Sequence, residues 1–178
     1  MNRLIRILPI AASLIGAILI VGCTDDLTAP SDPSFAQIRP EPITAVFTLC
    51  RPQPDAMAAG WIGPQGGVLK AGKHTLKVPR GALSSTVWIR IEAPSSSMNR
   101  VVISPSDLAL NQAYPAHLVM SYDNCAVAPG SEQQIVHING NLQVIQTAPS
   151  ETDPATMTVD GKLLRFSDYA LSTYAVVY

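Results

Sequence analysis

The feature that most constrains the fold is a period-two alternation of apolar and polar residues, which recurs in short runs. In Thr86–Glu92 the side chains of Val87, Ile89 and Ile91 fall on one face, and Ala116–Tyr122 has the same period. Such runs are typical of half-buried strands. No stretch has a convincing helical period, and prolines divide the runs, namely Pro94, Pro105, Pro115, Pro129 and Pro149. The sequence therefore predicts an all-β fold, an antiparallel β-sandwich.

Two dipeptides predict hairpins in the C-terminal part, residues 133–178. Asn139-Gly140 and Asp160-Gly161 each stand between two apolar runs, which are 134–138 and 142–147 for the first and 157–159 and 162–166 for the second. Both dipeptides supply the positive backbone angles that two-residue hairpin turns need. We therefore expect two tight hairpins here.

The predicted sandwich spans residues 44–178. Its first strand is expected in Thr44–Cys50, with Phe47 and Leu49 on one face. Its last strand is expected in Tyr174–Tyr178.

The N-terminal segment has the layout of a secretory signal. Arg3 and Arg6 precede Ile7–Val21, an apolar run of about 15 residues that is short for a membrane-spanning helix. The run ends in Val21-Gly22-Cys23, which resembles a bacterial lipobox. This resemblance implies cleavage before Cys23, with acyl chains on its thiol and on the new amino terminus. The alternative is an ordinary cleaved signal or a retained N-terminal helix, with Cys23 incidental.

The expected organisation is therefore a signal peptide (1–22), a lipidated tether (23–43) and the sandwich. The tether is rich in proline and polar residues, and such segments are extended and weakly structured. Two or more acyl chains attach a protein durably to a membrane. The predicted localisation is the cell envelope. Thr24 after Cys23 favours the outer membrane, although Asp25 weakens that inference.

The charge excludes nucleic acid as an expected partner. The chain has 12 basic and 13 acidic side chains. Removing Arg3 and Arg6 with the signal leaves 12 − 2 = 10 basic side chains, a net charge near −3. No block of basic residues is present, so the electrostatic footprint of a nucleic-acid site is absent from the sequence.

Two cysteines remain once Cys23 is assigned to the lipid anchor. Cys50 and Cys125 form an even pair in an exported, oxidising setting, which favours a disulfide. The bridge would close a loop of about 75 residues. Two free buried thiols are the alternative.

The middle of the chain resembles the ZU-five domain of zonula occludens scaffolds, Unc-five netrin receptors and ankyrins. The residues that carry the resemblance are Gly66-Gly67-Val68-Leu69, the run His74–Leu83 with Pro79-Arg80-Gly81-Ala82-Leu83, Pro115–Tyr122, and Phe166-Ser167-Asp168-Tyr169-Ala170. The expected core of this domain is residues 62–125. The resemblance implies a β-rich module that mediates contacts between proteins.

Physical considerations assign structural roles to these motif residues. Pro79 ends a strand because it has no amide hydrogen to donate. Gly81 permits a turn closed to residues with a Cβ, after which Ala82 and Leu83 return to the core. Gly66 and Gly67 allow close packing at the entry to a strand.

Some relatives of ZU-five domains cut themselves between Phe and Ser in a His-Phe-Ser sequence. Phe166-Ser167 is present here, but Arg165 occupies the histidine position. Arginine cannot act as a general base, so we expect no self-cleavage and no enzyme.

The sequence predicts no cofactor and no metal site. Three histidines are present, His74, His117 and His137, and two of them meeting Asp123 across a sheet would be the one candidate zinc set. No spacing supports that set.

The expected function is that of a lipid-anchored, non-enzymatic module for protein contacts or structure in the envelope. Trp88 and Arg90 lie on the polar face of their strand and form the candidate contact surface. The alternative for Trp88 is that this face is also covered. The alternative function is a carbohydrate- or wall-binding accessory module, and the third is a self-processing domain cut at Phe166-Ser167.

Overall fold

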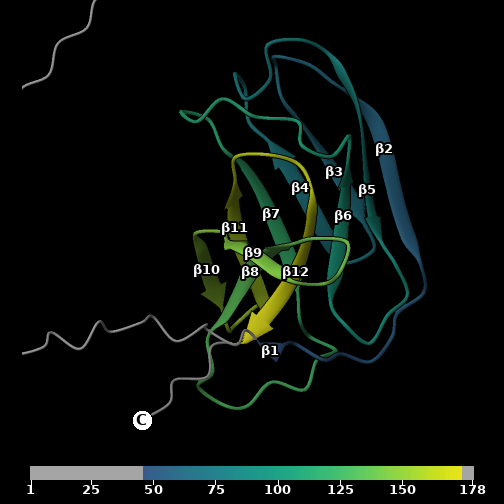
Figure 1. The fold of residues 1–178 in the computed structure, drawn as a ribbon, viewed down its shortest axis with the longest axis vertical. Helices are drawn as coiled ribbons and strands as arrows, with labels where there is room; N and C mark the ends of the chain where they lie inside the picture. The colour runs from purple at the N-terminus through teal and green to yellow at the C-terminus, as the bar shows by residue number, and fades with distance from the viewer. Residues whose placement is uncertain (1–45, 174–178) are drawn as a thin grey trace, which may run out of the picture. The chain divides into compact units, whose positions relative to one another are not determined.

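The computed structural model describes residues 46–173, which form strands in two packed antiparallel sheets and contain no helix (Figure 1). The strands are β1 (Val46–Phe47), β2 (Ala56–Ile62), β3 (Gly67–Ala71), β4 (His74–Val78), β5 (Val87–Ala93), β6 (Arg100–Ser104), β7 (Ala116–Ser121), β8 (Gln133–Ile138), β9 (Val144–Thr147), β10 (Ser150–Asp153), β11 (Thr158–Leu163) and β12 (Asp168–Thr173). The predicted all-β sandwich is confirmed. Nothing in these residues is a helix long and apolar enough to cross a membrane.

The larger sheet has the order β2-β5-β6-β12-β8-β9, and β1 pairs with β12. The smaller sheet has the order β10-β11-β7-β4-β3. Four hairpins connect neighbours within a sheet, namely β3–β4, β5–β6, β8–β9 and β10–β11. After most other strands the chain crosses to the opposite sheet. As a result β12 lies in the middle of the larger sheet, whereas β2 forms one of its ends.

The alternation predicted for β5 and β7 is confirmed. Ile89 and Ile91 of β5, and Leu118 and Met120 of β7, are fully buried between the sheets. Each such aliphatic side chain contributes roughly 1.5–3 kcal/mol on transfer from water. These side chains belong to one continuous core that includes strands of both sheets.

The predicted Asp160-Gly161 turn is wrong, because both residues lie in the middle of β11. Gly161 pairs with Leu118 of β7 and with Ser150 of β10. A Cβ at Gly161 would come within 2.8 Å of the Cδ1 atom of Ile135 in the opposite sheet. The glycine therefore serves close packing between sheets, and the hairpin turn lies at residues 154–157 instead.

The Asn139-Gly140 hairpin exists, but its loop is longer than two residues. The amide of Asn139 donates to the carbonyl oxygen of Gln143 at 3.0 Å, and the residue with positive φ (59°) is Leu142. The side chain of Asn139 accepts from the amides of Asn141 and Gln143 at 2.9 Å. Asn139 therefore organises the loop through its side chain rather than through its backbone angle.

The first predicted strand is shorter than expected. β1 ends at Phe47, and the next side chain, Thr48, is buried and donates to Oε1 of Gln133 at 2.6 Å. Leu49 is 60% exposed, so it does not share a buried face with Phe47. Cys23, the tether (23–43) and the expected strand 174–178 lie outside the described residues.

Two motif glycines occupy turns that require them. Gly66 has φ of 80°, and a Cβ there would collide with the carbonyl oxygen of Val78. Gly81 has φ of 84° and lies against the ring of Tyr114. Pro79 directly follows β4, Gly67 begins β3, and Ala82 and Leu83 are buried.

Candidate functional site

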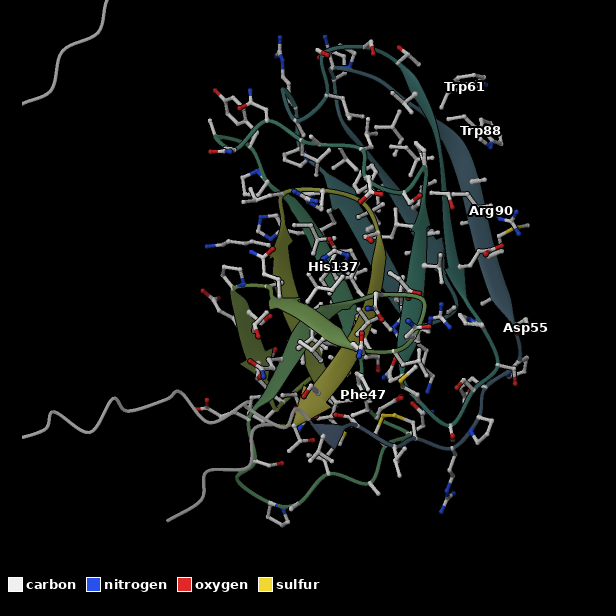
Figure 2. The ribbon with its side chains drawn as sticks, viewed as in Figure 1. Phe47, Asp55, Trp61, Trp88, Arg90 and His137 are labelled. Atoms are coloured by element: carbon white, nitrogen blue, oxygen red, sulfur yellow. A yellow bond between two sulfur atoms is a disulfide. The ribbon has the colours of Figure 1, made fainter. Side chains whose placement is uncertain are left out.

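Two exposed tryptophans lie together on the outer face of the larger sheet, at its β2 end. Trp61 of β2 is directly opposite Trp88 of β5 and is 70% exposed, while Trp88 is 49% exposed. Their ring centroids are 5.3 Å apart, with an angle of 66° between the rings. Figure 2 shows both indoles at the outer margin of the molecule. The described residues therefore do not cover this face of β5.

The burial of Ile89 and Ile91 on the inner face of β5 places Arg90, the residue between them, on the outer face. The guanidinium of Arg90 forms an ion pair with Glu92 two residues later. Both side chains are partly exposed, and exposed ion pairs contribute about 1 kcal/mol or less. The pair thus forms a polar strip next to the apolar outer face of β2.

The strand β2 is not predicted by the alternation in the sequence. Its outward residues are Met57, Ala59 and Trp61, and its inward residues are mostly small. Gly60 faces Leu69 of the opposite sheet, whose Cδ2 lies 3.5 Å from the position of a Cβ on the glycine. In β2 the usual alternation is inverted, since the large apolar residues point to solvent and the small residues point to the core. This inverted pattern of large and small residues could have indicated the strand.

A second arrangement of interest joins β8 to the start of β12. Nε2 of His137 lies 2.7 Å from Oγ of Ser167, and Ser167 is buried. The pairing of β8 with β12, with His137 opposite Tyr169, brings these residues together. Arg165, beside Phe166 in the sequence, cannot act as a base, but His137 lies within hydrogen-bond distance of Ser167 although it is 30 residues away along the chain.

The peptide bond before Ser167 is held in place on its Phe166 side. The carbonyl oxygen of Phe166 accepts from the amide of Asp107 at 2.7 Å, and the Phe166 side chain is fully buried. Such a donor polarises a carbonyl, as one half of an oxyanion hole does. The ring of Tyr169 lies 5.6 Å from that of His137, and burial raises the pKa of Tyr169. Ser167, His137 and Phe166 thus bring together a hydroxyl, a base and a polarised carbonyl.

His74 lines a cavity of about 270 Å³ beside the start of β2. Its Nδ1 is buried and has no hydrogen-bond partner among the described residues. Burial lowers the pKa of His74 to about 4, and Lys73 adds to this effect while Asp123 opposes it. The imidazole is therefore neutral at physiological pH. Nζ of Lys73 lies 2.6 Å from the Asp123 carboxylate, and this contact lowers the pKa of Asp123.

Cys50 and Cys125 form a disulfide in the structure, across a sequence separation of 75 residues. The bridge links the segment before β2 to the segment after β7. Chain-entropy arguments give a loop of this length about 4 kcal/mol of stabilisation.

The remaining histidine, His117, pairs with Asp160 rather than with Asp123. Its Nδ1 lies 2.9 Å from Oδ1 of Asp160. Residues 46–173 contain no group of three or more His, Cys, Asp or Glu side chains placed to hold a metal ion.

Comparisons with known proteins add no family assignment. No protein-family model matches the chain, and no curated protein matches it. The ZU-five resemblance stays a prediction from the residues quoted above.

Proposed function

We propose that the chain is a lipid-anchored cell-envelope protein whose sandwich binds another protein through the outer face of β2 and β5. The observation that carries the proposal is the exposure of Trp61 and Trp88 side by side. Tryptophan dominates many protein interfaces because it buries a large area with few rotamers to fix. Arg90 supplies a second residue type that interfaces favour.

A protein partner fits this face better than a sugar does. The angle of 66° between the two indoles means that they do not form one flat platform for a sugar ring. Neither indole lines the cavity beside His74. Met57 continues the apolar surface along β2 and is 59% exposed. An open apolar face with a polar strip resembles the core and rim of a protein interface.

The anchor would confine this face to the membrane surface. Confinement raises the effective concentration of the face toward partners in the same envelope. The support for the anchor is the sequence Val21-Gly22-Cys23. Changing Cys23→Ser should abolish fatty-acid labelling and release the protein from membranes, and continued attachment would contradict the lipobox.

The test is cross-linking in intact cells of the native producer, followed by purification of the tagged protein. We expect a protein partner whose recovery falls about tenfold in Trp88→Ala, which corresponds to a loss of 1.4 kcal/mol. Ile145→Ala is the matched control, because Ile145 is 58% exposed at the other end of the same sheet. Equal recovery from both variants would contradict the proposal, and recovery of polysaccharide alone would favour the carbohydrate-binding alternative.

Self-processing at the Phe166–Ser167 bond is the second candidate function, and the His137–Ser167 hydrogen bond favours it. Ser167 Oγ would attack the Phe166 carbonyl carbon while its proton passes to Nε2 of His137. The amide C–N bond breaks, and the released nitrogen takes up a proton as an ester forms. Water then hydrolyses the ester, which leaves a Phe166 carboxylate and a free Ser167 hydroxyl.

A fragment of residues 167–178 would be the product, 12 residues long. It would remain bound after cleavage, because β12 pairs with both β6 and β8. The measurement is therefore mass spectrometry of the full chain under denaturing conditions. The self-processing candidate predicts two masses for the unchanged chain and one for His137→Gln and Ser167→Ala. A single intact mass for the unchanged chain would exclude it.

A further inference from the structure

We infer that β2 pairs with β2 of a second copy of this chain, in antiparallel register centred on Ala59. The larger sheets of the two copies would then form one continuous sheet. This inference rests on the proposed function, since it places a contact at the strand edge beside the outer face of β2 and β5, and it names the partner at that edge.

Among the sheet edges of residues 46–173, the outer edge of β2 has the fewest protective features. Natural sheets protect their edges by short strands, charges, prolines or bulges. β2 has seven residues, Ala56–Ile62, without a charged residue or a proline. Its pairing with β5 runs through all seven positions without a register shift.

The other sheet ends each carry such a feature. β3 contains Lys70. β9 has four residues, and its pairing with β8 contains a register shift at His137. β10 has four residues, of which Glu151 and Asp153 are acidic. The contrast within one domain indicates that the edge of β2 is left open for a contact.

The backbone of β2 specifies an extended strand as the occupant. Within residues 46–173, β5 is the only strand that pairs with β2, and no hydrogen bond of a turn or loop satisfies an amide of residues 56–62. Alternate N–H and C=O groups therefore point away from the sheet along the whole strand. An antiparallel partner of the same length would supply about six hydrogen bonds to this row.

The side chains make β2 complementary to itself. In a register centred on Ala59, Met57 of one copy stands opposite Trp61 of the other, twice by symmetry. Thioether and indole attract each other when the sulfur lies near the ring. The first charged residue before the strand, Asp55, falls opposite Gly63 of the partner, so no like charges meet within the paired segment. Figure 2 shows Asp55 and Trp61 near opposite ends of β2.

The test is site-specific disulfide trapping with the full chain in its membrane. Residues opposite each other across an antiparallel pair have Cα atoms about 4.5–5.5 Å apart, which is within bridging range. Ala59→Cys should therefore form a disulfide-linked dimer on mild oxidation, in about tenfold greater yield than Glu151→Cys on the exposed edge β10. Cys50 and Cys125 are already bridged and do not compete.

The register is tested by a mixed experiment. Met57→Cys alone should dimerise poorly, because in this register the two copies of position 57 lie about 13 Å apart along the strands. Mixing Met57→Cys with Trp61→Cys should restore the dimer. Adding Ala59→Glu to both chains should abolish it, since two carboxylates would then face each other directly across the strand pair.

The inference would be overturned if Ala59→Cys gave no dimer and Trp88→Ala no longer recovered a partner that is a different protein. That result would leave the proposed function standing. Dimers from Ala59→Cys with unchanged recovery in Trp88→Ala would support the pairing of β2 and contradict the role proposed for Trp88.

Discussion

The two sheets end very differently at β2 and at β10. β2 closes the larger sheet with seven residues whose outer face is apolar, including Met57 and Trp61. β10 closes the smaller sheet with four residues, two of them acidic, between Pro149 and Pro154. Both edges belong to one domain. The difference shows that architecture alone does not decide which edge is available, since the residue types on each edge decide it.

The interpretation of the β2 end as a contact surface would be wrong if the outer residues of β2 and β5 were needed for folding. We expect Ile91→Ala to lower the free energy of unfolding by about 2–5 kcal/mol, because it removes a fully buried side chain. Trp88→Ala should cost about 1 kcal/mol, chiefly the aromatic pair with Trp61. Urea unfolding of both variants measures the two losses. Equal losses would make the outer face part of the fold rather than a contact surface.

The edges at β2 and β10 should also respond differently to pH, because the titratable groups beside them have different pKa shifts. His74, beside the start of β2, has a pKa of about 4 in the folded chain and 6.5 when unfolded. The unfolded chain therefore binds more protons between these values. Stability should be unaffected by His74 above pH 6.5 and should fall by about 3 kcal/mol as the pH drops from 6.5 to 4.

This loss should be absent from His74→Gln, measured by urea unfolding at pH 7 and pH 5. At the β10 turn, the carboxylate of Asp153 accepts hydrogen bonds from Thr156 and Ala155, which lower the pKa of Asp153. That turn should therefore keep its contacts until the pH falls below the ordinary range of an aspartate. A wild-type chain as stable at pH 5 as at pH 7 would contradict the role of His74.

The smallest effect is expected from an added charge on β2. Ala59→Glu changes an exposed residue that lies opposite Arg90. The free energy of unfolding should change by less than about 0.5 kcal/mol. The same variant should lose contacts made through the edge. A large drop in stability would show that the edge is not free.

The fold class could be predicted because strands such as β5 and β7 bury one face and show a clear alternation. β2 could not be found in that way, since its inward residues are small and its outward residues include Trp61. Gly161 was misplaced because the Asp-Gly dipeptide is a local signal, whereas the residue that decides its role, Ile135, lies in the opposite sheet.

Only some residues of the candidate site could be predicted from the sequence. Trp88 and Arg90 were identified from the alternation of their own strand. Trp61 joins them through the register of β2 with β5, and His137 reaches Ser167 through the register of β8 with β12. Registers between distant strands are set by packing and cannot be derived from the linear pattern.

The central claim is that the outer face of β2 and β5 is covered by a partner in the cell. Oxidative footprinting of the unchanged protein tests it with an internal control, because Met57 is 59% exposed and Met157, at the β10 turn, is 39% exposed. In the dilute purified chain Met57 should be oxidised faster than Met157. In intact cells the account predicts that this order reverses, because only Met57 becomes covered. The same order in cells as in the purified chain would contradict it.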